Sequence, residues 1–181
     1  ELGHPDQWNA DYWNRLRHLA VGMKAREMVL ILPVWDHWQM YQAQSGHWDR
    51  HPYKPNNHYQ CGMPGVNWQT CEDFIPKAEL TNTLLFPAWY RNVSGRRAIM
   101  VNLLAKATAG VGDLDNVIWE PMNEPRNGDP GDILGWHEWG IDRLQEMNTG
   151  IVTTATPDEP EQENIFRLPG ISITSFHALG H

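Results

Sequence analysis

Two adjacent side chains, Asn123 and Glu124, have the residue types and the position that acid/base chemistry requires. They follow the apolar run at residues 117–119, and Pro125 comes next and restricts the backbone. Cleavage of a glycosidic bond uses two carboxyl groups, one that protonates the leaving oxygen and one that attacks or activates water. We predict Glu124 as the acid/base and Asn123 as a contact for a sugar hydroxyl. The alternative is that Asn-Glu-Pro is only a turn leading out of a strand.

Aromatic side chains supply a second indication of the ligand. The 181 residues include ten tryptophans, and flat aromatic faces pack against the C–H faces of sugar rings. After the apolar run at residues 28–35, we predict Trp38 as a sugar-stacking residue, whereas Trp35 is a candidate for the core. His37 is a candidate hydrogen-bonding contact to substrate, or a loop histidine with a local partner. For any single tryptophan, packing in the core is the simpler alternative.

The charge and the apolar patterning exclude several classes of partner. The formal net charge is −8 and the 14 Lys and Arg residues are scattered, which disfavours nucleic acid. No apolar run approaches the roughly 20 residues of a membrane-spanning helix. The glycines at 110 and 112 precede a predicted strand instead of following one, so no phosphate-binding turn is indicated. We predict a carbohydrate ligand, no cofactor and no membrane segment.

Histidines and cysteines gather in one Pro-, Gly- and Asn-rich stretch, but their spacing matches no closed Cys/His zinc motif. We therefore predict no metal site and keep a metal-dependent hydrolase as a minor alternative. The residues concerned are His47, His51, His58, Cys61 and Cys71.

The cysteines and one tripeptide bear on the compartment. Cys61 and Cys71 are the only cysteines; an exported protein could join them as a disulfide, and a cytosolic one would keep two thiols. The tripeptide at residues 92–94, Asn-Val-Ser, fits the N-glycosylation pattern. We expect a secreted or extracellular protein.

Helical periodicity alternates with short apolar runs along the chain, apart from a long irregular stretch at residues 36–87. Asp6 or Asn9 is available to cap the first helix. The predicted helices are 11–27, 90–109 and 136–147, and the predicted strands are 28–35, 116–119, 150–155 and 170–177.

This alternation predicts an α/β fold with a parallel sheet. A closed (β/α)8 barrel is favoured over an open doubly wound sheet because polar residues follow the strands, as they do at the active end of a barrel. These residues are Asp36 and His37 after the first strand, Asn123 and Glu124 after the second, and His177 after the fourth.

The segment Trp119–Arg126, with the sequence WEPMNEPR, resembles the strand-4 signature of clan A glycoside hydrolases, in particular cellulase-like and mannanase-like members. The resemblance implies that Glu124 is the general acid/base and that Asn123 contacts the hydroxyl next to the anomeric carbon. Less specifically, residues 29–38 resemble strand 3, and residues 172–177 resemble strand 6, whose terminal histidine, His177, borders the active site.

The same resemblance implies that residues 1–181 are the central part of an incomplete TIM barrel, from about helix 2 to strand 6. Many members have a tyrosine two residues after the strand-6 histidine, where this chain has Leu179. The family's nucleophile is a glutamate after strand 7, which we expect beyond His181. Three further carboxylates are not assigned as the nucleophile: Asp36, Glu120, which is expected to support the site by hydrogen bonding, and Glu138.

The resulting hypothesis is a retaining glycoside hydrolase acting on a β-linked polysaccharide or oligosaccharide. We expect residues 1–181 alone to be inactive. The alternative is a non-catalytic carbohydrate-binding or structural protein on a glycosidase-derived barrel. Sugar and linkage stay open because they are chosen by loops after several strands.

Overall fold

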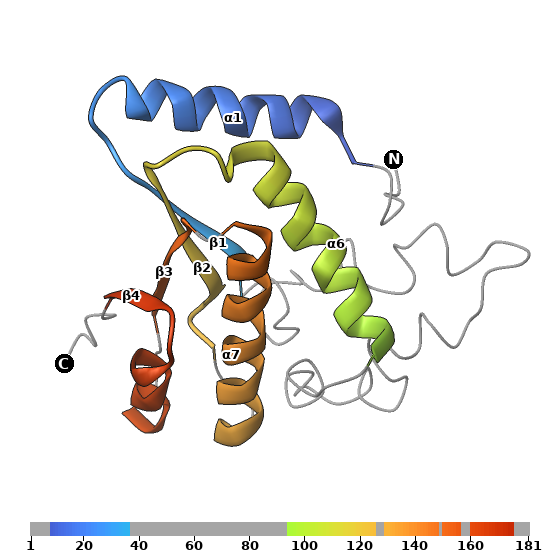
Figure 1. The fold of residues 1–181 in the computed structure, drawn as a ribbon, viewed down its shortest axis with the longest axis vertical. Coiled ribbons are helices and arrows are strands. Elements are labelled where there is room, and N and C mark those ends of the chain that lie inside the picture. The colour runs from blue at the N-terminus through green and yellow to red at the C-terminus, as the bar shows by residue number, and fades with distance from the viewer. Residues whose placement is uncertain (1–7, 37–93, 126–128, 149, 157–159, 176–181) are drawn as a thin grey trace, which may run out of the picture.

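The computed structural model describes residues 8–36, 94–125, 129–148, 150–156 and 160–175 (Figure 1). Within these residues, helices alternate with short strands in the predicted order, with one additional 3-10 helix before the last strand. The elements are α1 (Ala10–Lys24), β1 (Leu30–Asp36), α6 (Ser94–Val111), β2 (Val117–Asn123), α7 (Pro130–Met147), β3 (Val152–Ala155), η3 (Pro160–Arg167) and β4 (Ile171–Thr174).

The strands form one four-stranded sheet in the order β1-β2-β3-β4, and every neighbouring pair is parallel. The helices follow the same order: α1 contacts α6, α6 contacts α7, and α7 contacts η3. α6 also contacts β1, and α7 contacts β2 (Figure 1). The prediction of an α/β fold with a parallel sheet is therefore confirmed, and closure of this sheet into a barrel stays a prediction.

Strand β2 extends beyond the predicted end at Trp119. Its ladder with β1 continues to the pair Asp36 and Asn123. Glu120 and Pro121 lie beyond that predicted end, yet both residues belong to the strand and both are buried. Asn123 is therefore the last residue of the strand, and Glu124 follows it directly.

A bulge explains how a proline fits inside this central strand. Trp119 pairs with Thr153, and the next bridge joins Asn123 to Thr156, so β2 advances four residues while its neighbour advances three. The extra residue of a bulge needs no ladder hydrogen bond, which suits a residue without an N–H group. Pro121 is also in close contact with α7, because a Cβ at Gly140 would lie 3.5 Å from the Cβ of Pro121.

Helix α7 begins at Pro130, six residues before the predicted start at Trp136. Asp129 caps it: its Oδ1 accepts hydrogen bonds from the N–H groups of Gly131 at 2.8 Å and Asp132 at 3.2 Å. Proline is well suited to the first helical position because the N–H that it lacks would have no intrahelical partner. At α1, Asn9, one of the two caps that the sequence offered, is the cap, since its side chain accepts from the N–H groups of Asp11 and Tyr12.

Replacing the cap of α7 is expected to weaken the fold. Asp129→Ala should lower the free energy of unfolding by about 1 kcal/mol, because two N–H groups of the first turn lose their acceptor. Urea denaturation followed by circular dichroism measures this change. Asp129→Asn is the control, since an amide oxygen also caps and should cost only a few tenths of a kcal/mol. Equal midpoints for the wild type and Asp129→Ala would contradict the assigned cap.

Large aromatic side chains fill the space between the helices and the sheet. Trp136 is completely buried, and its ring lies edge-on to that of Trp35 with centroids 5.3 Å apart. The Arg97 guanidinium lies 4.1 Å from the centroid of Trp139 and 5.9 Å from that of Trp136. The burial of Trp35, 4% exposed, agrees with its interpretation as a core residue.

A completely buried histidine on α7 makes the fold sensitive to acid. The imidazole Nδ1 of His137 lies 2.9 Å from the carbonyl oxygen of Ile133, and burial lowers the pKa of His137 from 6.5 to about 4. The unfolded chain therefore binds the proton at a higher pH than the folded chain does. The stability conferred by the neutral folded imidazole is present above the unfolded pKa and is lost as the pH falls from about 6.5 towards 4.

This difference predicts a measurable pH dependence. Between pH 7 and pH 5 the wild type should lose about 2 kcal/mol of unfolding free energy through His137, given about 1.4 kcal/mol for each unit of pKa difference. Urea denaturation of the wild type and of His137→Leu at the two pH values isolates the contribution of His137 to the change in unfolding free energy. His18→Leu, at an exposed position of α1, is the control and should keep the wild-type slope. An unchanged slope in His137→Leu would refute the explanation.

Candidate functional site

Polar residues from three strands meet at the carboxyl edge of the sheet. Asp36 ends β1, Asn123 ends β2, and Thr156 directly follows β3. Asp36 is paired with Asn123 in the ladder, and a parallel bridge joins Asn123 to Thr156. The three residues are thus neighbours across the sheet, at the edge where parallel α/β proteins place their ligand and catalytic sites.

Hydrogen bonds connect these side chains into a chain across the strand ends. The Nδ2 group of Asn123 donates to Oδ1 of Asp36 at 3.5 Å. On the other side, the Thr156 hydroxyl lies 3.4 Å from Oδ1 of Asn123 and donates to Oε1 of Glu120. Glu120 is 3% exposed, so its carboxyl group is held within the sheet. This bond agrees with the interpretation of Glu120 as a supporting residue.

Glu124 has an unusual backbone. Its φ is 47°, in the left-handed region, and its side chain is buried with 7% exposure. Left-handed geometry in a residue other than glycine costs on the order of 1 kcal/mol or more, and it is common at active sites and ligand-binding positions. The turn redirects the chain immediately after β2 and before Pro125. Glu124 therefore lies beside the hydrogen-bonded side chains of Asp36, Asn123 and Thr156, one residue beyond Asn123.

The other predicted site residues lie outside the described residues. This holds for His37, Trp38 and His177. It also holds for the long stretch with its histidines and two cysteines, so the disulfide and secretion remain predictions. Glu138, whose role was left open, is exposed on α7.

Thr156 was not singled out from the sequence, although a signal existed. Strand β3 was predicted to end at Ala155, so Thr156 is the first residue after a predicted strand, the same kind of position from which Asp36 was singled out. Because the strands are parallel, a hydroxyl at that position lies at the same edge of the sheet as Asp36 and Asn123. The left-handed backbone of Glu124 had no local sequence signal, since glutamate is not a residue that favours positive φ.

No group of three or more His, Cys, Asp or Glu side chains arranged to hold a metal ion occurs in the described part of the chain. No helix in that same part is long and apolar enough to cross a membrane.

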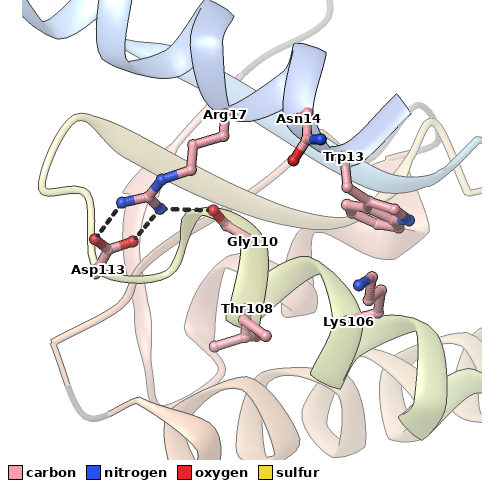
Figure 2. A pocket seen from close by; sticks show the side chains of 8 residues that line it. Trp13, Asn14, Arg17, Lys106, Thr108, Gly110 and Asp113 are labelled. Atoms are coloured by element: carbon pink, nitrogen blue, oxygen red, sulfur yellow. Dashed lines mark hydrogen bonds and ion pairs between the residues drawn. The ribbon is translucent and has the colours of Figure 1, made fainter. Parts of the chain in front are cut away.

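A separate pocket of about 440 Å³ lies between α1 and α6 (Figure 2). Trp13 and Asn14 of α1 and Lys106 and Thr108 of α6 line it. The Lys106 ammonium lies 5.9 Å from the centroid of the Trp13 ring. The indole also packs on the second helix, because a Cβ at Gly110 would lie 3.5 Å from its Cε3. Trp13 is therefore a packing residue between the two helices.

An ion pair lies at one end of this pocket. Arg17 donates to both carboxylate oxygens of Asp113, at 2.7 and 2.8 Å, and to the carbonyl oxygen of Gly110 at 2.7 Å (Figure 2). The hydrogen bond from Arg17 lowers the pKa of Asp113 to about 2. Gly110 and Asp113 come just before β2, whereas Glu124 follows its carboxyl end. The pocket is thus at the opposite end of β2 from Asp36, Asn123 and Thr156.

No protein-family model matches the sequence, and no curated protein and no solved structure is significantly similar to the chain. The class of protein therefore follows from the structure itself. Over the residues that the structure describes, the chain is an α/β protein with a parallel four-stranded sheet. Polar residues and a buried, left-handed glutamate lie at the carboxyl ends of its first strands.

Proposed function

We propose that this chain forms part of the catalytic domain of a retaining glycoside hydrolase that acts on a β-linked polysaccharide or oligosaccharide, with Glu124 as general acid/base. The observation that carries the proposal is the position and backbone of Glu124. It follows β2 in a left-handed conformation, beside the hydrogen-bonded chain of Asp36, Asn123 and Thr156. The WEPMNEPR segment supplies the family resemblance on which the reaction class depends.

The order of strands and helices supports the barrel interpretation. In a doubly wound sheet the strand order reverses once, and helices cover both faces. Here the order is sequential and each helix contacts the next along the chain, from α1 through α6 and α7 to η3. A single layer of helices outside a sequential parallel sheet is the arrangement of a (β/α)8 barrel. In that fold the active site is at the carboxyl ends of the strands.

The strained backbone at position 124 supports a functional side chain there. Glycine adopts a left-handed turn without steric cost, so a turn alone would favour glycine. A glutamate that is held in this geometry and kept 7% exposed is costly to fold. That cost is accounted for if the carboxyl group must have a fixed position relative to a substrate.

The site residues that the structure describes have distinct roles in the proposed reaction. Glu124 protonates the glycosidic oxygen as the leaving group departs and later removes a proton from the attacking water. Asn123 contacts the sugar hydroxyl next to the anomeric carbon. Asp36 and Glu120 hydrogen-bond to Asn123 and Thr156, so we assign them to support and assign the nucleophile to neither.

The substrate class is tested with the protein expressed from its complete reading frame. We expect one member of a panel of β-linked glucans, mannans and xylans to release reducing ends, and the first product to have the β configuration by proton NMR. An initial α product would exclude the retaining mechanism. Binding of a polysaccharide without hydrolysis would favour the non-catalytic carbohydrate-binding alternative. Activity that is abolished by a chelator and restored by zinc would favour a metal-dependent hydrolase.

A further inference from the structure

The amide of Asn123 lies between two neighbours that favour opposite orientations of it. Its Nδ2 group donates to Oδ1 of Asp36 on β1 at 3.5 Å, and its Oδ1 lies 3.4 Å from the hydroxyl oxygen of Thr156, which follows β3. The β1–β2 ladder and the bridge to Thr156 hold the three backbones at these positions. Exchanging the amide nitrogen and oxygen therefore needs only a half-turn of the side chain about its last bond.

Thr156 favours the exchanged orientation. A threonine hydroxyl has one proton, and Thr156 donates it to Oε1 of Glu120, which is 3% exposed. Only the lone pairs of the Thr156 oxygen remain for Asn123, so two acceptors face each other in the observed orientation. An N–H of Asn123 at this position would instead give the Thr156 oxygen a donor.

Asp36 favours the observed orientation. A carboxylate only accepts hydrogen bonds, so the amide nitrogen can donate to it, whereas the amide oxygen would face a second acceptor of the same sign of charge. A hydrogen bond to a charged acceptor is roughly twice as strong as one between neutral groups. The carboxylate of Asp36 should therefore outweigh the neutral oxygen of Thr156.

We propose that Asp36 is a positioning residue whose negative charge sets the orientation of the Asn123 amide against the preference of Thr156. The amide then presents its nitrogen towards β1 and its oxygen towards β3. One N–H is directed at Asp36, and no described residue accepts the second N–H. A ligand at the strand ends should offer that N–H an acceptor, as the oxygen of a sugar hydroxyl does. This last step rests on the proposed function, because it takes a sugar as the ligand.

Neutron diffraction from deuterated crystals tests the orientation directly, because it locates the deuterium atoms that distinguish the amide nitrogen from the amide oxygen. The protein is expressed from its complete reading frame and crystallised at pH 7 without substrate. In the wild type we expect a deuterium between Nδ2 of Asn123 and Asp36, and the hydroxyl deuterium of Thr156 directed at Glu120. A Thr156 deuterium directed at Asn123, or an Asn123 deuterium directed at Thr156, would overturn the proposal.

Asp36→Asn removes the charge and keeps the size of the side chain. The new amide can either accept from Asn123 or donate to it, so Thr156 decides, and the Asn123 deuterium atoms should move to the Thr156 side. Asp36→Ala should give the same change and is used if the first variant does not fold. Thr156→Val removes the opposing preference and should keep the wild-type orientation. An Asn123 amide that keeps its orientation in the Asp36 variant, or that turns in Thr156→Val, would overturn the role of Asp36.

The consequence for a ligand is tested by kinetics with the polysaccharide that is hydrolysed in the panel. Asp36→Asn should lower kcat/KM about tenfold, as the loss of one hydrogen bond to the ligand allows. Asp142→Asn, at an exposed position of α7, removes the same charge and should leave kcat/KM within about twofold of the wild-type value. A turned amide with unchanged kcat/KM, or equal losses in the two variants, would overturn the positioning role. If the wild type hydrolysed no substrate, the proposed function would fail, whereas the deuterium positions would still decide the orientation of Asn123.

Discussion

Glu124→Gln should lower kcat/KM for the β-linked substrate by about 10²- to 10⁴-fold, the range that a positioned general acid/base contributes. Glutamine has nearly the same size and can keep the left-handed turn, but it cannot donate a proton to the leaving oxygen. Initial rates of reducing-end release measure the effect. Substrates with a good leaving group should be affected less, because their departure depends less on protonation.

Glu138→Gln is the control for this substitution. Glu138 is exposed on α7, and losing its charge should leave kcat/KM within about twofold of the wild-type value, as expected of surface substitutions away from the site. Comparable losses in the two variants would mean that charge or stability, and not the position of Glu124, determines the rate. Unchanged activity in Glu124→Gln would exclude it as the acid/base.

Trp136→Ala should produce the largest loss of stability among single substitutions in the described core, about 3–5 kcal/mol. The indole is completely buried, lies edge-on to Trp35, and its Nε1 group donates to Sδ of Met100 at 3.4 Å. Alanine would leave a cavity where α6, α7 and β1 meet. Urea denaturation of the two proteins at pH 7 measures the difference.

Trp136→Phe is the graded control, because it keeps an aromatic ring and removes only part of the volume. Its loss should be clearly smaller than that of the alanine variant. Trp139 is only partly buried, so Trp139→Ala should also cost less. A loss below about 1 kcal/mol in Trp136→Ala would contradict the packing described for this residue.

The order of the elements could be predicted from sequence because its signals are local. Apolar residues at helical spacing in α1 and α6, and short apolar runs in β1 and β2, each identify an element without knowledge of its neighbours. The parallel sheet follows from their alternation, since consecutive strands linked by helices must run in the same direction.

The boundary of β2 depended on contacts that the local pattern does not contain, whereas the start of α7 depended on a local cap that apolar spacing alone does not reveal. Glu120 and Pro121 have low strand propensity, but pairing with β1 and the bulge opposite β3 keep them in the sheet. The first turn of α7 has little apolar character, and its start is determined by the Asp129 cap. At β2 tertiary contacts outweigh intrinsic propensity, and at α7 the two hydrogen bonds accepted by Asp129 determine the start of the helix.

The candidate site was predictable only in part. Asn123 and Glu124 stand next to each other in sequence, so their motif was visible. The connection of Asn123 to Asp36 and Thr156 joins residues 87 and 33 positions away, which only the sheet register brings together. The hydrogen bond from Thr156 to Glu120 likewise joins residues 36 positions apart.

The most direct test of Glu124 as the acid/base is a crystal structure of the Glu124→Gln protein, expressed from its complete reading frame, with a bound β-linked oligosaccharide. We predict that the oligosaccharide spans the carboxyl ends of β1 and β2. The glycosidic oxygen should lie within hydrogen-bonding distance of the side chain at position 124, about 2.6–3.2 Å. An oligosaccharide bound elsewhere, or a glycosidic oxygen well beyond the reach of that side chain, would contradict the proposal.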